Sequence, residues 1–310
     1  MSTLTRAEAP RNALDERLAA GPISWGVCEV PGWGLQLPPE RVLAEMHALG
    51  IVATEAGPDG YLGADPERVR ALLAANGLTL VGGFLPVVLH EPRELEATLA
   101  KVHRTAAFFS RLGAHVICSA AVVDDTWSPR VELTGPEWDH LLAALPLLDE
   151  AAAEHGVRHV LHPHWGTLVE QAADVARVLE GSGARICLDT GHLALGGADT
   201  LGIARTYAGR VAHVHLKDVD GAVAARLRSG ELDLVGAVRA GLFKPLGDGD
   251  ARVDEVVLAL DGAGYDGWLV LEQDVAIADG GASPADDVRR SVEFLHRLLP
   301  LPATEGGRID

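Results

Sequence analysis

The chain has 310 residues, of which 48% are hydrophobic and 23% are charged, and its formal net charge is −18 at pH 7. These proportions are typical of a globular enzyme, and the length suits either one large α/β barrel or two smaller domains. The negative charge argues against binding nucleic acid or an anionic membrane surface, because both would be repelled.

The sequence pattern at the start of the chain does not predict a secretory signal peptide. Residues 1–19 mix Arg, Glu and Asp with Ala and contain no apolar signal core. No run of about 18 apolar residues predicts a transmembrane helix. Cys28, Cys118 and Cys187 form an odd, widely spaced set, which predicts reduced thiols in a cytoplasmic protein. We expect a lead-in over residues 1–20, one catalytic domain over 21–300 and a tail over 301–310.

Short apolar runs alternate with longer helical patterns along the whole chain. The apolar runs predict eight strands, at Ile23–Gly26, Ile51–Glu55, Thr79–Phe84, His115–Ser119, His159–His164, Arg185–Asp189, Val211–Leu216 and Trp268–Glu272. The helical patterns predict helices at Pro39–Leu49, Pro66–Asn76, Pro92–Leu112, Glu137–His155, Leu168–Glu180, Thr200–Ala208, Val253–Ala263 and Asp286–Leu299.

The order of these elements predicts a single-domain α/β fold, the (β/α)8 TIM barrel. Eight strand-and-helix units are the number that this barrel requires. A glycine follows each of five predicted helices, where a left-handed residue commonly ends a helix: Gly50, Gly77, Gly113, Gly156 and Gly264. An open doubly wound sheet is the alternative, but no GxGxxG sequence follows the first predicted strand.

Two connections are longer than a turn requires. Ala120–Pro136 follows the fourth predicted strand and contains Trp127, and Lys217–Asp250 follows the seventh and contains Lys244. Insertions of this kind cover the substrate at the carboxyl-terminal face of a barrel. We therefore predict two lid elements, with Lys244 as a candidate for substrate contact.

Four of the predicted strands end in residues that bind metal ions. His162, Asp189, His215 and Glu272 stand at the ends of the fifth to eighth strands. Because these strand ends meet at one face of a barrel, we expect the four side chains to form one site. Two carboxylates and two imidazoles suit a divalent ion, with Mn²⁺ or Co²⁺ favoured and Fe²⁺, Zn²⁺ or Mg²⁺ as further candidates.

Three further residues near the strand ends are candidates for catalysis or binding. Glu55 ends the second strand and could act as a general acid or base, or could be an ordinary capping group. His164 and His192 follow two of the proposed ligands by two or three residues. Either could contact substrate oxygens or support a ligand from behind; we assign His164 to substrate binding and His192 to catalysis.

A lysine and two tryptophans complete the set of candidates. Lys217 could stabilise an enolate oxygen, or it could form a structural ion pair with Asp218. Trp25 and Trp165 could stack on the apolar face of a sugar or polyol ring, or could pack in the core.

Several segments resemble the xylose-isomerase-like sugar isomerase and epimerase superfamily, and within it the inosose (2-keto-myo-inositol) dehydratases. The resemblance runs from about Gly21 to Leu299. It rests on these segments: Leu161-His162-Pro163-His164-Trp165-Gly166-Thr167, Leu188-Asp189-Thr190-Gly191-His192, His213-Val214-His215-Leu216-Lys217-Asp218-Val219, Pro245-Leu246-Gly247-Asp248-Gly249 and Gly267-Trp268-Leu269-Val270-Leu271-Glu272-Gln273-Asp274.

The resemblance implies a TIM barrel, a bound Mn²⁺ or Co²⁺ ion, and removal of water from a keto-inositol to give a dione. It also implies that Asp189, His215 and Glu272 are metal ligands, whereas His162 occupies a place that is Glu in many superfamily members. The chain departs from the dehydratase pattern in Pro163, where the dehydratases have a third His, and in the Gly82–Pro86 segment, where they have an aromatic-rich strand. Both changes bear on the substrate.

The chemistry of such a site allows more than one reaction. A divalent ion bound to a ketone and its adjacent hydroxyl acidifies the neighbouring C–H, and a base then removes that proton to leave an enediolate. Loss of a β-hydroxyl gives dehydration of inosose or a related keto-polyol, whereas reprotonation gives sugar isomerisation or epimerisation. A β-elimination on 3-keto-glycosides and a ligand-binding barrel without catalysis are further alternatives. The expected partner is a small keto-polyol or sugar. Assembly into a homo-oligomer is compatible with the sequence.

Overall fold

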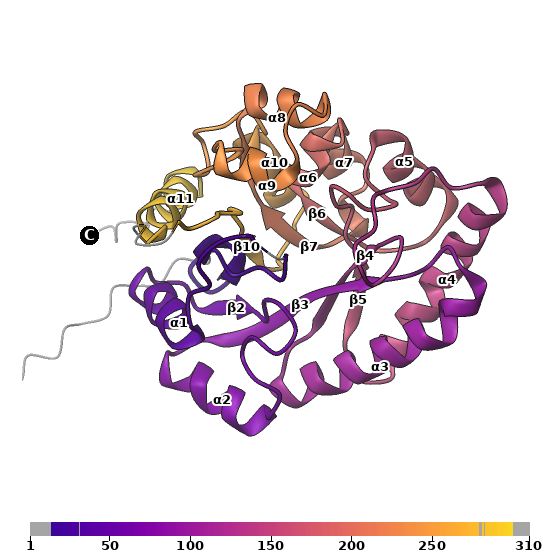
Figure 1. Ribbon diagram of the computed structural model, residues 1–310. Helices are drawn as coiled ribbons and strands as arrows, with labels where there is room; N and C mark the ends of the chain where they lie inside the picture. The colour runs from indigo at the N-terminus through magenta and orange to yellow at the C-terminus, as the bar shows by residue number, and fades with distance from the viewer. Residues whose placement is uncertain (1–13, 31, 279–280, 282, 300–310) are drawn as a thin grey trace, which may run out of the picture.

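Eight parallel strands form a closed barrel surrounded by helices (Figure 1). The computed structural model describes residues 14–30, 32–278, 281 and 283–299. Around the barrel the strands follow the order β1-β10-β7-β6-β5-β4-β3-β2. Their bounds are Leu18–Ala20 (β1), Ala53–Glu55 (β2), Thr79–Val87 (β3), Val116–Ala121 (β4), Arg158–Leu161 (β5), Ile186–Asp189 (β6), Val211–Leu216 (β7) and Leu269–Leu271 (β10). The predicted single-domain TIM barrel is confirmed.

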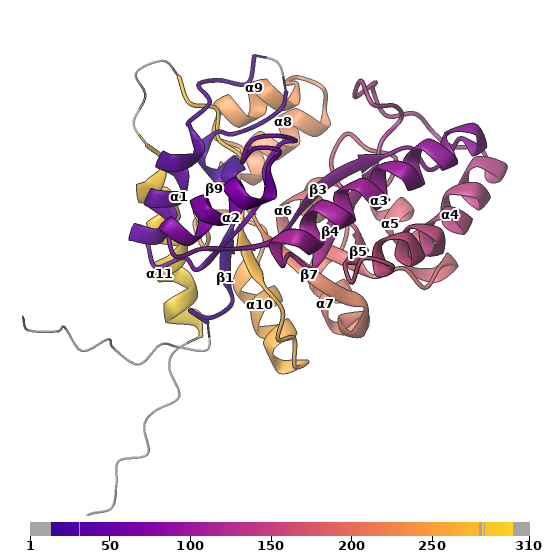
Figure 2. The same cartoon turned by 90° about the horizontal axis from the view of Figure 1, so that it is seen from below.

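The helices lie outside the strands, and Figure 2 shows α8 and α9 together over one end of the barrel. The helix bounds are Pro39–Ala48 (α1), Pro66–Ala75 (α2), Leu95–Leu112 (α3), Gly135–Ala153 (α4), Ala172–Gly181 (α5), Thr190–Leu195 (α6), Thr200–Thr206 (α7), Gly221–Arg228 (α8), Leu234–Arg239 (α9), Val253–Gly262 (α10) and Ala285–Leu298 (α11). Three short 3-10 helices are at Pro22–Trp25, Pro92–Glu94 and Ala208–Arg210. Within the described residues, no helix is long and apolar enough to span a membrane.

The first strand is not where the sequence pattern predicted it. β1 is Leu18–Ala20, which pairs with β10 on one side and β2 on the other. The predicted strand Ile23–Gly26 is wrong, because Pro22–Trp25 forms a 3-10 helix that ends at Gly26 with φ of 76°. Pro22 opens that helix, as proline commonly does. The barrel thus begins inside the predicted lead-in, and the predicted tail 301–310 lies outside the described residues.

The glycines that were predicted to end helices do so. All five have φ between 63° and 79°, the left-handed region that glycine enters without a steric penalty: Gly50, Gly77, Gly113, Gly156 and Gly264. Each one turns the chain from a helix into the next strand, as the barrel requires.

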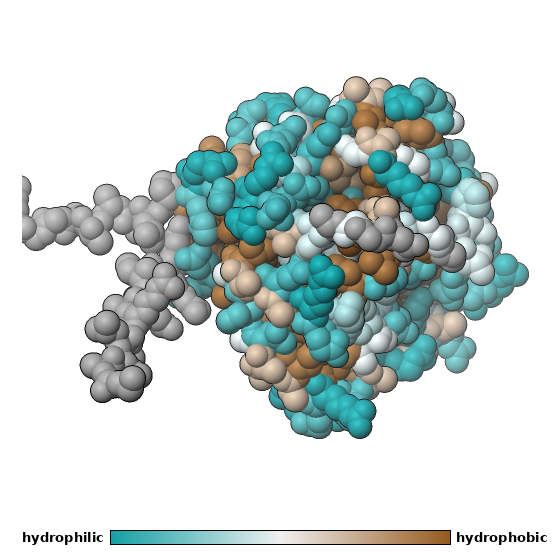
Figure 3. Space-filling view, turned by 60° about the vertical axis from the view of Figure 1, so that its left-hand side comes forward, coloured by the Kyte–Doolittle hydropathy of each residue, from teal (hydrophilic) through white to brown (hydrophobic). Residues whose placement is uncertain are grey.

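Apolar side chains fill both the helix–strand layer and part of the barrel interior. The surface in Figure 3 is mainly hydrophilic, with hydrophobic residues between hydrophilic ones. Ala19, Ala53, Val81 and Val270 form one small interior cluster from four neighbouring strands. Because paired residues point to the same face of a sheet, His215 shares the interior with its partners Val270 and Asp189. Charged side chains therefore share the barrel interior with this apolar cluster.

A buried Ser–His–Asp row connects the barrel to α4. The His159 ring lies 2.6 Å from Ser119 Oγ and 2.6 Å from Asp149 Oδ1. The order resembles a nucleophilic triad, but Ser119 is fully buried between strand and helix, so a substrate cannot reach its hydroxyl. We interpret this row as a structural link that satisfies buried polar atoms.

The carboxylate of Asp218 holds part of the long connection after β7. It contains β8 (Asp218–Val219) and β9 (Phe243–Lys244), which pair antiparallel, as well as α8 and α9. Asp218 Oδ2 accepts the N–H groups of Gly247 and Gly249 at 2.9 and 3.0 Å, and Oδ1 accepts that of Ala251 at 2.9 Å. Asp218 thus shapes the loop that returns from the lid to the barrel.

We expect Asp218→Ala to lower the free energy of unfolding by about 3 kcal/mol, because four backbone donors, those of Val219, Gly247, Gly249 and Ala251, lose a charged acceptor. Hydrogen exchange of Gly247, Gly249 and Ala251 should also accelerate. Urea denaturation with site-resolved exchange measures both effects. The control is Asp233→Ala, which removes a cap on one exposed N–H, that of Gly236, and should cost about 1 kcal/mol. Equal losses in the two variants would contradict this prediction.

Candidate active site

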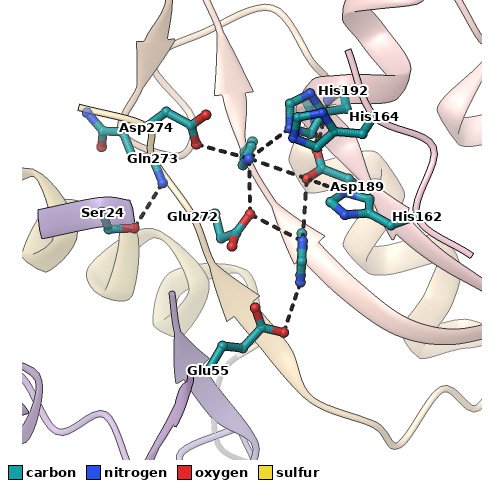
Figure 4. A network of polar contacts seen from close by, with 12 residues as sticks. Ser24, Glu55, His162, His164, Asp189, His192, Glu272, Gln273 and Asp274 are labelled. Atoms are coloured by element: carbon teal, nitrogen blue, oxygen red, sulfur yellow. Dashed lines mark hydrogen bonds and ion pairs between the residues drawn. The ribbon is translucent and has the colours of Figure 1, made fainter. Parts of the chain in front are cut away.

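The four predicted metal ligands converge at the carboxyl-terminal ends of their strands, and Figure 4 labels three of them, His162, Asp189 and Glu272. Asp189 Oδ2 lies 3.3 Å from His162 Nε2 and 3.6 Å from His215 Nδ1. His215 Nδ1 lies 3.2 Å from Glu272 Oε2. At least nine-tenths of each of the four side chains is buried. The structure therefore brings together residues that are separated by more than a hundred positions in the sequence.

Local structure orients the carboxylate of Asp189. The residue ends β6 and caps α6, and its Oδ1 accepts the N–H groups of Gly191 and His192, both at 2.8 Å. This bonding leaves Oδ2 directed at the imidazoles. Burial alone would raise the pKa of Asp189, but the nearby Lys217 and His192 hold it well below its ordinary value. Asp189 is therefore a carboxylate at neutral pH.

Lys217 is the cationic centre of the site. Its Nζ lies 2.9 Å from Asp274 Oδ1, 3.0 Å from Glu272 Oε2 and 3.7 Å from Asp189 Oδ2, and the residue is 2% exposed. Burial lowers the pKa of Lys217, but the three carboxylates outweigh burial and raise it well above the ordinary value. Lys217 does not pair with Asp218, contrary to one of the two predicted roles.

Glu272 is ionised in the same surroundings. Burial would raise its pKa, but the imidazole of His215 and the ammonium of Lys217 lower it to about 2. Because Glu272 contacts both groups through Oε2, this oxygen connects the proposed metal ligands to the cationic centre.

Two stacked imidazoles form the other side of the site. The rings of His164 and His192 have centroids 3.7 Å apart, and Lys217 Nζ lies 3.0 Å from His192 Nε2. Burial, His164 and Lys217 together keep the pKa of His192 well below its ordinary value. Burial, His162 and Lys217 lower that of His164 to about 3. Both rings are therefore neutral at pH 7, and each keeps a nitrogen lone pair.

We expect the metal-free protein to lose stability as the pH falls from about 6.5 toward 3. In this range the unfolded chain protonates His164 and His192, whereas the folded chain does not, so the free energy of unfolding decreases. Urea denaturation of chelator-treated protein at several pH values measures the slope. His164→Gln should reduce that slope, and equal stability of the wild type at pH 7 and pH 5 would contradict the prediction.

An aromatic pair borders the imidazoles. Phe84 on β3 and Trp127 in the connection after β4 stack with ring centroids 6.0 Å apart and an interplanar angle of 14°. The Phe84 ring lies 6.0 Å from His162, and that of Trp127 lies 6.2 Å from His164. Trp127 has φ of 59°, an uncommon conformation for a bulky residue, which the surrounding contacts must stabilise. The predicted lid therefore contributes an apolar wall to the site.

Three predicted substrate-binding residues are placed differently. Trp25 is fully buried in the core, and its Nε1 donates to Glu45 at 2.8 Å, so it does not face the site. Lys244 Nζ pairs with Asp220 Oδ2 at 3.3 Å and forms no ion pair with the proposed metal ligands, although it lines a small pocket together with Glu272. Trp165 is partly buried, and its backbone N–H lies 3.3 Å from His192 Nδ1. Of these three residues, Trp165 is the one that contacts a candidate catalytic residue, His192.

Glu55 contacts the Nε2 nitrogen of His215, whereas Asp189 and Glu272 face its Nδ1 nitrogen. Glu55 Oε1 is 2.8 Å from His213 Nε2 and 3.1 Å from His215 Nε2, and the residue is 3% exposed. Burial would raise the pKa of Glu55, but the imidazoles of His215 and His213 lower it below its ordinary value. The carboxylate is ionised and is already bonded to two rings.

The described residues provide donors that fit a divalent ion. One ligand atom each from Asp189, His215 and Glu272 can be chosen so that all lie within 4.8 Å of one another, and His162 joins Asp189 and His192 in an overlapping group. His215 Nδ1 is buried and has no hydrogen-bond partner, although carboxylates surround it. A buried imidazole nitrogen that faces two carboxylates is an arrangement in which a metal ion can take the place of a proton.

Sequence analysis missed some residues of this site. It did not assign roles to His213, Asp274, Phe84 or Trp127 in the chemistry. His213 alternates with His215, and Asp274 follows Glu272 by two residues, so the period of a strand could have indicated both. No sequence signal pairs Phe84 with Trp127, because their contact depends on the path of the connection after β4.

The protein is a closed parallel barrel, and carboxylates and imidazoles form a buried cluster at one end of its strands. The family model for xylose isomerase-like TIM barrel proteins matches residues 37–298. The chain belongs to this family.

Two relatives match most of the chain. An inosose dehydratase of Geobacillus kaustophilus (strain HTA426) is 32% identical over 301 residues, covering 91% of this chain and 94% of the relative. The rhizopine catabolism protein MocC of Rhizobium meliloti is 34% identical over 280 residues, covering 86% of this chain and 85% of MocC.

The barrel also resembles solved structures. D-psicose 3-epimerase of Clostridium cellulolyticum H10, solved with D-tagatose, superposes with a TM-score of 0.69. The two chains are 16% identical, and the match covers 91% of this chain and 99% of the epimerase. At this identity the likeness supports the fold.

Proposed function

We propose that this protein is a metal-dependent lyase that removes water from inosose or a closely related keto-polyol. The observation that carries the proposal is the convergence of Asp189, His215 and Glu272 around an unpartnered imidazole nitrogen, beside a buried lysine. The 32% identity to an inosose dehydratase over most of both chains supports the choice of reaction.

In this proposal Asp189, His215 and Glu272 hold the ion, with His162 as a fourth ligand through its contact with Asp189. When bound, a divalent ion polarises a substrate carbonyl and makes the adjacent C–H more acidic. We propose Mn²⁺ or Co²⁺ because mixed carboxylate and imidazole donors suit these ions. Fe²⁺, Zn²⁺ and Mg²⁺ are the alternatives for the experiment below.

The protein's own residues then divide the proton transfers. His192 is neutral, and its Nε2 and Nδ1 face Lys217 Nζ and the Trp165 N–H, so we propose that it takes the proton from carbon when a bound substrate replaces one of these two contacts. The ammonium of Lys217, 3.0 Å from His192 Nε2, stabilises the negative charge that develops on the substrate oxygen. Lys217 can also protonate a departing hydroxyl, because it carries a proton at neutral pH.

The aromatic wall of Phe84 and Trp127 supports a ring-shaped substrate. The C–H face of a cyclic polyol is apolar and packs well on an aromatic surface. The hydroxyl groups on the other face would meet His164 and the carboxylates, which provide the polar contacts that orient a ligand. The Gly82–Pro86 segment contains Phe84 of this wall, and Pro163 lies between His162 and His164 in the sequence. Both places depart from the dehydratase pattern, so both bear on which keto-polyol fits.

The test is an assay of metal-loaded protein with inosose. We expect an increase in ultraviolet absorbance from the unsaturated dione with Mn²⁺ or Co²⁺, and its loss after chelation. Solvent deuterium entering the substrate without loss of water would instead select the isomerase or epimerase. Release of an alcohol from a 3-keto-glycoside, with inosose unchanged, would select the β-elimination alternative. Metal binding without turnover on any of these compounds would contradict the enzyme proposal.

A further inference from the structure

His215 lies between two sets of carboxylates. On one side its Nδ1 faces Glu272 Oε2 at 3.2 Å and Asp189 Oδ2 at 3.6 Å. On the other side its Nε2 faces Glu55 Oε1 at 3.1 Å. The ring is 1% exposed, so water does not compete for either nitrogen. In Figure 4, Glu55 lies at the bottom of the network, with Glu272 and Asp189 above it.

A neutral imidazole has one N–H donor and one acceptor nitrogen. Glu55 is a carboxylate and can only accept, so its contact with Nε2 requires the proton on that nitrogen. The contact of Nδ1 with Glu272 Oε2 at 3.2 Å favours a proton on this nitrogen as well, so a metal ion would take the place of the Nδ1 proton while Glu55 keeps the proton on Nε2. We assign these proton positions from the contacts.

The contact of Glu55 spans the barrel interior. Glu55 ends β2, and His215 lies on β7, which is separated from β2 by β10 and β1 in the barrel order. His213, two residues before His215 on the same face of β7, donates to the same Oε1 at 2.8 Å. Two donors on one oxygen hold the carboxylate in place and leave little freedom for Glu55 to turn toward a substrate.

We propose that Glu55 is a positioning residue that fixes the tautomer and the orientation of the metal ligand His215, with His213 as its anchor. The proposal rests on the proposed metal site. Carboxylates behind metal-bound imidazoles typically change metal affinity by 10–100-fold when they are removed. Glu55 acts in this way through His215 and does not remove a proton from the substrate.

The experiment measures metal affinity and turnover separately in Glu55→Gln and Glu55→Ala. We expect the affinity for Mn²⁺, measured by chelator competition, to fall about 10-fold in the glutamine variant and up to about 100-fold in the alanine variant. The Co²⁺ absorption spectrum should also shift, because the orientation of His215 changes. Excess Mn²⁺ should restore part of the turnover in Glu55→Gln.

Two controls separate this role from a general structural one. Glu45→Gln alters a glutamate that accepts from Trp25 Nε1 at 2.8 Å away from the cluster, so metal affinity should not change. His213→Asn removes the imidazole that donates to Glu55 but leaves Glu55 itself unchanged. We expect metal affinity to fall several-fold in this variant. The second variant also keeps the proposal testable if Glu55→Gln does not fold.

Three outcomes would overturn the proposal. Unchanged metal affinity in Glu55→Gln, with turnover lost even in excess Mn²⁺, would make Glu55 a base that acts on substrate. Two ions per chain, one of which is lost in both Glu55→Gln and Cys118→Ser, would make Glu55 a direct ligand, since Glu55, Cys118, His213 and His215 can also gather donor atoms within 4.8 Å. If the wild-type protein binds no ion, the proposed function fails together with this proposal. The first two outcomes, in contrast, contradict only the role given to Glu55.

Discussion

Replacing Asp189 by Asn should lower kcat/KM at least about 10³-fold, which corresponds to about 4 kcal/mol of transition-state stabilisation. Asp189 Oδ2 contacts His162, His215 and Lys217 at 3.3, 3.6 and 3.7 Å, so it is the carboxylate oxygen that joins the proposed ligands. An amide removes the negative charge from this position. The affinity for the metal ion should therefore fall together with the rate.

The measurement pairs steady-state kinetics on inosose with the metal content of the protein. A suitable control is Asp199→Asn, because Asp199 caps α7 through the N–H of Gly202 at 2.9 Å, as Asp189 caps α6, but lies outside the cluster. This variant should keep its metal and its rate. Full metal occupancy and normal turnover in Asp189→Asn would show that the ion, if any, binds elsewhere.

Replacing Lys217 by Met should destabilise the metal-free protein by about 3–5 kcal/mol. The loss arises because Glu272, Asp274 and Asp189 would remain buried without their common cation. A bound divalent ion supplies positive charge to two of these carboxylates, so the destabilisation should be smaller in the metal-loaded protein. Turnover should fall in both states, because the charge on the substrate oxygen loses its partner.

Urea denaturation with and without Mn²⁺ measures both parts of the prediction. Lys244→Met is the matched control, because Lys244 pairs with Asp220 where both side chains are about one-third exposed, and its loss should cost less than about 1 kcal/mol. Metal affinity should not decrease in Lys217→Met, since the removed ammonium repels the ion. Equal destabilisation of the two lysine variants would contradict the central position given to Lys217.

Much of the fold follows from local pattern. The five glycines after helices mark the unit boundaries because each needs a left-handed conformation, and the structure has them all in that region. β1 escaped the same analysis because Leu18–Ala20 is only three residues long and follows an alanine-rich segment that resembles a helix. Such a short strand is stabilised by its neighbours β2 and β10 more than by its own sequence.

The candidate metal ligands were predictable because each ends an apolar strand, and strand ends of a closed barrel meet at one face. The sequence by itself determined the barrel, the strand-end positions of the four candidate ligands and the chemistry that such donors favour. Only the tertiary structure decided which side of each group faces which partner. Glu55 is bonded to His213 and His215 across the barrel, Lys217 pairs with Asp274 and not with its neighbour Asp218, and Trp25 lies in the core. Such pairings depend on side-chain directions between strands distant in the chain, which no local pattern encodes.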